Sequence, residues 1–114
     1  MKKPKPLHLR VMAEYGSSGI WRVSTNPTGP FRHGMLEHAS LDLPADLAQA
    51  FDDWIERYTL ENLAGTLDKT AFNLEGHRLA TRLKAFLSSR GHTPHVELQG
   101  EAEDGSLLAA LVID

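Results

Sequence analysis

Six histidines are the residues in this chain whose type could hold a metal ion or move protons. His33 and His38 are five residues apart, and His92 and His95 are three apart. Neither spacing is the helical i, i+4 pair of zinc peptidases, and the chain has no cysteine to complete a thiolate site. A four-ligand site would need all four of these histidines to converge. We therefore predict that the chain binds no metal and needs no cofactor.

Nucleophilic catalysis needs a serine, a histidine and an acid in contact. The serines between Gly16 and Gly19 do not sit in a strand–turn–helix elbow, and a hairpin turn accounts for them. Asp52 and Asp53 are adjacent on a predicted helix, so their carboxylates point to different sides. The glycines also supply no phosphate-binding turn between a strand and a helix. These patterns favour a protein that performs no chemistry.

The length of 114 residues is enough for one hydrophobic core and too short for two. We expect a flexible tail over residues 1–6 and a single domain over residues 7–114. Apolar runs are far shorter than the ~20 residues of a membrane helix, and no apolar region follows the basic N-terminus, so we expect neither a membrane span nor a secretory signal. The absence of cysteine suits a reducing cytosol.

Charge alternates in blocks along the chain. Residues 1–36 carry a net charge of +5, residues 37–68 carry −7, residues 69–92 carry +4 and residues 93–114 carry −5. Opposite charges on neighbouring elements can attract each other within the fold, or an acidic surface can meet a basic partner. The net charge of −3 provides no basic field, so we expect no direct binding of nucleic acid.

Alternating apolar and polar residues predict three strands, over residues 7–15, 20–24 and 94–102. The first two should form an antiparallel hairpin. We expect a loop over residues 25–35, while residues 36–43 form either a third short strand or an irregular lead-in to a helix. Asp104 and Gly105 indicate a second hairpin turn. The continuous apolar run of residues 107–113 after this turn predicts a central strand.

Two amphipathic helices lie between these strands. The first should begin with Pro44 at its first helical position and end before Gly65. The second should have Asn73 as its N-cap and stop at Gly91. Trp54 and Tyr58, on the apolar stripe of the first helix, are expected in the core, although a stripe wider than the sheet can cover would bring one of them to the surface as a binding anchor.

The element order predicts an α+β fold in which two helices pack on one face of a mostly antiparallel sheet of four to five strands. The apolar faces of these elements predict the core residues Leu9, Val11, Phe51, Trp54, Leu79, Leu83, Phe86 and Leu98.

Two segments together resemble one group of small bacterial proteins. Residues 9–16, LRVMAEYG, followed by Trp21, are similar to the opening strand of that group, R-L/V-M-A-D/E-Y-G. Residues 72–83, FNLEGHRLATRL, are similar to its second helix, F-x-x-E-G-R-x-L-A-x-R-L, with His77 where arginine is commoner. The group is similar to the small acidic immunity proteins of bacterial polymorphic and contact-dependent toxin systems. The resemblance implies a cytoplasmic, non-enzymatic protein that binds a cognate toxin domain, often a nuclease, and blocks its active site.

The acidic residues are our candidates for the contact with such a toxin, because nuclease active sites are basic and opposite charge speeds and orients encounter. One group lies along the first helix and the other at the tip of the last hairpin. The predicted partner-binding residues are Asp46, Asp52, Asp53, Glu56, Glu101, Glu103 and Asp104. A structural or regulatory interaction domain without a toxin partner is the alternative, and a small enzyme is the third hypothesis.

Overall fold

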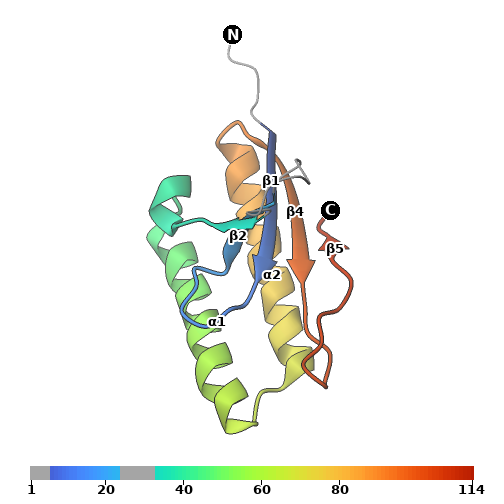
Figure 1. Cartoon of the computed structure of the whole chain (residues 1–114). Coiled ribbons are helices and arrows are strands. Elements are labelled where there is room, and N and C mark those ends of the chain that lie inside the picture. The colour runs from blue at the N-terminus through green and yellow to red at the C-terminus, as the bar shows by residue number, and fades with distance from the viewer. Residues whose placement is uncertain (1–5, 24–32) are drawn as a thin grey trace.

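A computed structural model of the chain describes residues 6–23 and 33–114 (Figure 1). The predicted tail, apart from Pro6, and most of the predicted loop over residues 25–35 lie outside these ranges. The elements are β1 (Pro6–Met12), β2 (Ile20–Val23), β3 (His33–Met35), the 3-10 helix η1 (His38–Leu41), α1 (Ala45–Ala64), α2 (Lys69–Ser89), β4 (Thr93–Gln99) and β5 (Leu111–Val112). Among the described residues, neither α-helix combines the length and the apolar character that crossing a membrane requires.

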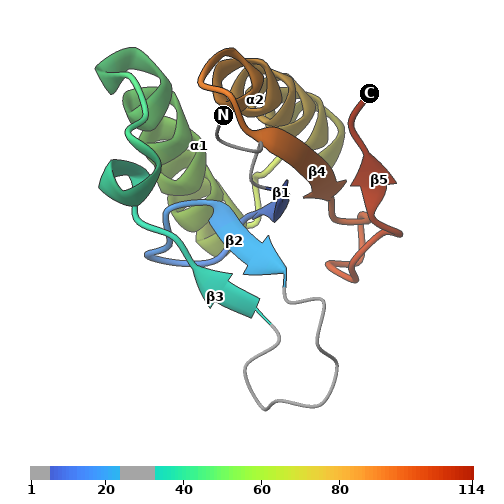
Figure 2. The same cartoon turned by 90° about the horizontal axis from the view of Figure 1, so that it is seen from above.

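The sheet has the strand order β3-β2-β1-β4-β5. The pair β1 and β4 is parallel, and the other three pairs are antiparallel. Parallel neighbours need a long crossover connection, which here contains both α-helices. Figure 2 shows α1 and α2 together on one side of the sheet. The predicted α+β fold, with two helices on one face of a mostly antiparallel sheet, is therefore confirmed.

The core lies between the central strands and the two helices. In β1, Leu9 and Val11 are fully buried, and they pair in register with Val96 and Leu98 of β4. Alternation along each strand sends these residues toward the helices, because successive side chains point to opposite faces. Of the predicted core residues, only Phe86 is partly rather than fully buried. The buried apolar residues are Leu9, Val11, Ala13, Ile20, Leu47, Phe51, Trp54, Ile55, Tyr58, Phe72, Leu79, Ala80, Leu83, Leu87, Val96, Leu98 and Ile113.

The ends of the helices correct two details of the predictions. Pro44 is the N-cap of α1 rather than its first residue, while the predicted end at Gly65 is confirmed by a left-handed φ of 72°. The second helix begins four residues earlier than its predicted cap, because Asp68 accepts a hydrogen bond from the Ala71 backbone N–H at 3.1 Å. Asn73, the predicted N-cap, is therefore inside α2.

The segment before α1 settles an alternative that the sequence left open. Residues 36–43 do not form a strand: they contain the 3-10 helix His38–Leu41, which is a lead-in to α1. The third strand, His33–Met35, lies instead at the end of the segment predicted to be a loop. It pairs with β2 and forms one edge of the sheet.

The C-terminal apolar run is not the central strand that its composition predicts. Only Leu111 and Val112 form a strand, β5, at the other edge of the sheet, and they are 52% and 50% exposed. The parallel pairing of β1 with β4 occupies the centre of the sheet instead. Of residues 107–113, only Ile113 is buried in the core, where its backbone N–H donates to Val96 at 2.9 Å.

Candidate functional site

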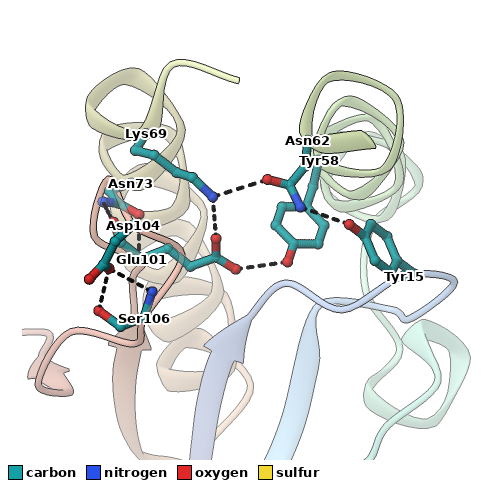
Figure 3. A network of polar contacts seen from close by, with 8 residues as sticks. All are labelled: Tyr15, Tyr58, Asn62, Lys69, Asn73, Glu101, Asp104 and Ser106. Atoms are coloured by element: carbon teal, nitrogen blue, oxygen red, sulfur yellow. Dashed lines mark hydrogen bonds and ion pairs between the residues drawn. The ribbon is translucent and has the colours of Figure 1, made fainter. Parts of the chain in front are cut away.

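A buried ion pair joins the start of α2 to the chain just after β4 (Figure 3). Lys69 and Glu101 are each 8% exposed, and the Lys69 ammonium donates a hydrogen bond to Oε2 of Glu101. Tyr58 of α1 donates to the other carboxylate oxygen, Oε1, at 2.8 Å. Burial of a charge is tolerated only when it is paired and hydrogen-bonded. Glu101 is therefore not on an exposed acidic surface, and it links both helices to the C-terminal segment instead.

The same network continues to the first hairpin. Lys69 Nζ donates to Asn62 Oδ1 at 3.1 Å, and Asn62 Nδ2 donates to the Tyr15 hydroxyl at 2.7 Å. Burial, followed by the hydrogen bond to Glu101 and its charge, raises the pKa of Tyr58 far above the ordinary value of 10.0. Tyr58 is therefore a neutral hydrogen-bond donor at neutral pH.

The two aromatic residues of α1 that could have been surface anchors are both in the core. Tyr58 is 8% exposed and Trp54 is 3% exposed. The Trp54 indole stacks on Phe72, with ring centroids 4.6 Å apart, and its Nε1 donates to the Phe72 carbonyl at 3.1 Å. The core placement of Trp54 is thus confirmed. Trp54 therefore provides no exposed apolar contact area beside the acidic residues of α1.

The remaining acids of the last hairpin, Glu103 and Asp104, are exposed in the turn that follows Glu101. Asn73 holds the base of this turn: its side chain donates to the Glu101 carbonyl at 2.9 Å and accepts from the Glu101 N–H at 3.0 Å. Hydrogen bonds from the hydroxyl and then the backbone N–H of Ser106 lower the pKa of Asp104. Figure 3 shows Asp104 on the α2 side of the network, away from α1.

The acids predicted along the first helix are all exposed on α1, and they are Asp46, Asp52, Asp53 and Glu56. Asp46 Oδ2 lies 3.3 Å from Arg82 of α2. Asp52 Oδ1 lies 3.9 Å from Nδ1 of His38, whose Nε2 contacts the Ser18 carbonyl oxygen at 2.9 Å. Exposed ion pairs contribute about 0–1 kcal/mol, so these contacts orient the acids more than they stabilise the fold.

Asp53 and Glu56 continue along the helix into an apolar stretch. Both line a shallow cleft that also contains Leu60. Leu60 is 62% exposed and Leu63 is 72% exposed. Spacings of three, four and three residues place Asp53, Glu56, Leu60 and Leu63 on one side of α1, which we call the outer α1 face. Periodicity could have revealed it, because these leucines are off the buried stripe of the helix.

Arg57 lies beside the outer α1 face and lines the same shallow cleft. Its Nε is 3.6 Å from Oε2 of Glu61, four residues along the helix. The positive charge of Arg57 is thus balanced by Glu61, and the carboxylates of Asp53 and Glu56 leave the outer α1 face with an excess of negative charge.

Figure 2 shows that one face of the sheet carries no helix of the described residues. Strand alternation places a second cluster of titratable groups on that face, because the residues between them in β1 and β4 are buried in the core. Arg10 and Glu97 are partners across β1 and β4, and the Arg10 Nε and Nη2 atoms donate to Glu97 Oε1 at 3.0 and 2.7 Å. His8 and His95 are also register partners, two residues before Arg10 and Glu97. Their Nε2 atoms each lie 3.7 Å from an oxygen of Glu97.

Glu97 is the anion at the centre of this cluster. Burial alone would raise the pKa of its carboxyl group, but the hydrogen bonds and charge of Arg10, with smaller contributions from His8 and His95, lower it below the ordinary value of 4.5. In the sequence, His92 is the histidine nearest to His95 and the candidate to act with it. In the structure, His95 lies beside His8 instead. The parallel pairing of two strands from opposite ends of the chain has no signal in local spacing.

An apolar groove of about 360 Å³ separates α2 from the C-terminal segment. Its apolar lining includes Leu74 of α2, Leu98 of β4, and Leu108 and Leu111 of the C-terminal segment, and His77 of α2 also lines it. Part of the run predicted as a buried central strand therefore lines an open groove.

No protein-family model, no curated protein and no solved structure matches this chain. The features of the chain that indicate a function are therefore the buried network, the outer α1 face, the cluster around Glu97, the apolar groove beside α2 and the resemblance of residues 9–16 and 72–83.

Proposed function

We propose that this chain is a binding protein that presents the outer α1 face to a basic surface of a protein partner. Asp53 and Glu56 supply negative charge there, and Leu60 and Leu63 supply apolar contact area. The observation that carries the proposal is this combination on one exposed side of a helix, because solvated acids alone are common on protein surfaces.

The acidic and the apolar residues of the outer α1 face contribute differently to the proposed complex. Burial of apolar surface stabilises a complex by about 25 cal/mol per Å², and Leu60 and Leu63 have most of their surface free for this purpose. The carboxylates act at longer range, since they speed encounter and favour one orientation. A partner with a basic cleft bordered by an apolar pocket fits both requirements.

The partner that we propose is a bacterial toxin domain in the cytosol, which the chain neutralises by covering its active site. The support for a toxin is the resemblance of the first strand and of α2 to immunity-type proteins, and the support for a basic active site is the acidity of the outer α1 face. Glu103 and Asp104 belong to a separate acidic turn on the α2 side, and we assign them a secondary role.

Co-expression tests this function. The genes beside this one are first searched for a larger gene with a toxin-like C-terminal domain, and the chain is then produced in a bacterial host together with that domain, whose expression alone should arrest growth. We expect growth to be restored and the two proteins to co-purify. Restored growth without a stable complex would instead support the hypothesis of a small enzyme. The absence of both effects would contradict the toxin assignment and favour a structural or regulatory interaction domain.

A further inference from the structure

The cluster on the helix-free face brings together three groups that can ligate a metal ion. One ligand atom from each of His8, His95 and Glu97 can be chosen so that all three lie within 4.8 Å of one another. The two imidazole rings are nearly perpendicular, at 86°, with centroids 4.5 Å apart. Tetrahedral zinc with bonds of about 2.0–2.1 Å holds its ligand atoms ~3.3 Å apart. The Nε2 atoms lie 3.7 Å from different oxygens of Glu97, that of His8 from Oε1 and that of His95 from Oε2, so the three side chains must rotate toward one point to reach that spacing.

His8 carries an unexplained polar atom. Its Nε2 is shielded from solvent and makes no hydrogen bond to any residue in the described part of the chain. A buried nitrogen without a partner costs free energy, and an ion is one of the partners that can satisfy it. Glu97 Oε1, which accepts both hydrogen bonds of Arg10, lies 3.7 Å from it, and the His95 ring packs edge-on against the His8 ring.

We propose that His8, His95 and Glu97 bind a divalent transition metal, and that zinc is the ion this site suits best. Two imidazoles and one carboxylate form a known zinc donor set, with the fourth position left to water. The spacing of histidines along the sequence predicts no metal site. That prediction could not include this pair, because His8 and His95 come from strands that are far apart in the chain. Because the apolar core contains none of the three ligand residues, we propose the ion as an additional ligand and not as a condition for folding.

Arg10 positions the carboxylate in this arrangement. Both of its hydrogen bonds go to Oε1 of Glu97, which holds the side chain against β1 and leaves Oε2 toward His95. Metal-ligating carboxylates are commonly oriented by such a second partner. A bound ion would connect β1 with β4 across the centre of the sheet. It would stabilise the fold because it would bind the folded chain more tightly than the unfolded chain.

The test is zinc titration of the untagged protein at neutral pH, followed by calorimetry. We expect one ion per chain, and Co²⁺ in place of zinc should give the visible absorption of a tetrahedral site. His8→Ala and His95→Ala should each weaken zinc binding by at least about tenfold. His77→Ala is the matched control, because His77 is exposed on α2 outside the cluster, and it should bind zinc like the wild type.

Thermal unfolding with and without zinc gives a second measurement. Zinc should raise the Tm of the wild type and of His77→Ala, and it should leave the Tm of His95→Ala unchanged. His95 is 48% exposed at its side chain, so this variant folds even if His8→Ala does not. No saturable binding by the wild type, or equal zinc affinity in wild type and His95→Ala, would overturn the proposal.

Discussion

Gly76 of α2 lies directly against the indole ring of Trp54 in α1. A Cβ atom on Gly76 would be 2.8 Å from Trp54 Cζ2 and 3.0 Å from Leu98 Cδ1. The Leu98 methyl can move, but the indole is held by its stacking on Phe72 and by its hydrogen bond to the Phe72 carbonyl. The glycine therefore sets how closely the two helices approach.

Gly76→Ala should destabilise the fold. Alanine stabilises the interior of a helix by about 1 kcal/mol relative to glycine, but overpacking of a filled core destabilises the fold by about 1–3 kcal/mol. Since the indole of Trp54 cannot move away, we expect a net loss, measured as a lower midpoint of urea unfolding. In the background of Trp54→Phe the same change should cost less, because the smaller ring leaves room. A raised midpoint for Gly76→Ala alone would show that the helices can separate without cost.

Lys69→Met should be among the most damaging single changes. It leaves the Glu101 carboxylate buried beside Tyr58 without a cation, and the removal of one partner of a buried pair costs about 3–5 kcal/mol. Arg57→Met is the matched control, because the Arg57–Glu61 pair is exposed and is worth less than about 1 kcal/mol. Free energies of unfolding from urea titrations compare the two variants. Equal losses would mean that Glu101 escapes to solvent when Lys69 is removed.

Acid should reduce the stability that the ion pair of Glu97 with Arg10 gives to the fold. The folded-state pKa of Glu97 lies below its ordinary value of 4.5, so the stability it contributes is present above the unfolded pKa and is lost as pH falls through the folded pKa. Arg10→Met removes the main group that lowers this pKa, so that only the smaller contributions of His8 and His95 oppose the effect of burial. The difference in unfolding free energy between wild type and Arg10→Met should therefore be large at neutral pH and shrink in acid. A difference that is independent of pH would contradict the pairing with Glu97.

Hydrogen exchange should separate the centre of the sheet from its C-terminal edge. The backbone amides of Val11 and Val96 lie in the buried parallel pair, and they should exchange slowest. Ala109 and Ala110 are exposed outside any strand and should exchange fast, although they belong to the most apolar run of the sequence. Slow exchange at both alanines would restore the central strand that the sequence predicted.

Charge reversal should identify the binding surface. Asp53→Lys with Glu56→Lys should slow association with the partner and flatten its dependence on salt, because steering charges act mainly on the association rate. Both side chains are exposed, so the fold should survive. Glu103→Lys with Asp104→Lys makes the same change of net charge at the acidic turn, and it should slow association less because we assign these residues a secondary role. If only this second pair slows association at low salt, the interface lies at the hairpin turn and the outer α1 face must be discarded.

The apolar residues of the outer α1 face, Leu60 and Leu63, should determine how long the complex lasts. Leu60→Ser and Leu63→Ser should increase the dissociation rate of the complex while the association rate stays close to that of the wild type, since apolar contacts act after encounter. Leu74→Ser is the control, because Leu74 is also exposed, at 53%, but lies in the groove beside α2. Surface plasmon resonance with the co-purified partner measures both rates. An effect of Leu74→Ser alone would move the interface to that groove.

Local pattern in the sequence determined which face of each element is apolar. A strand alternates its side chains and a helix repeats every 3.6 residues, so Leu9 and Val11, and likewise Phe51 and Trp54, could be assigned to the core before any tertiary contact was known. Gly65 could be assigned as a helix end for the same kind of reason, because a left-handed cap is a local requirement. From these faces the α+β class follows, since two helices and a sheet must cover one another.

Only the tertiary structure decided which elements are neighbours. The parallel pairing of β1 with β4 displaced the apolar run of residues 107–113 to the edge, and the same pairing brought His8 beside His95. The sequence predicts Glu101 at the acidic tip of the last hairpin, yet in the structure Lys69 and Tyr58 enclose it. The physical reason is common to all three cases: the periodicity of a segment reflects its own two faces, whereas burial, pairing and charge compensation are set by segments far away in the chain.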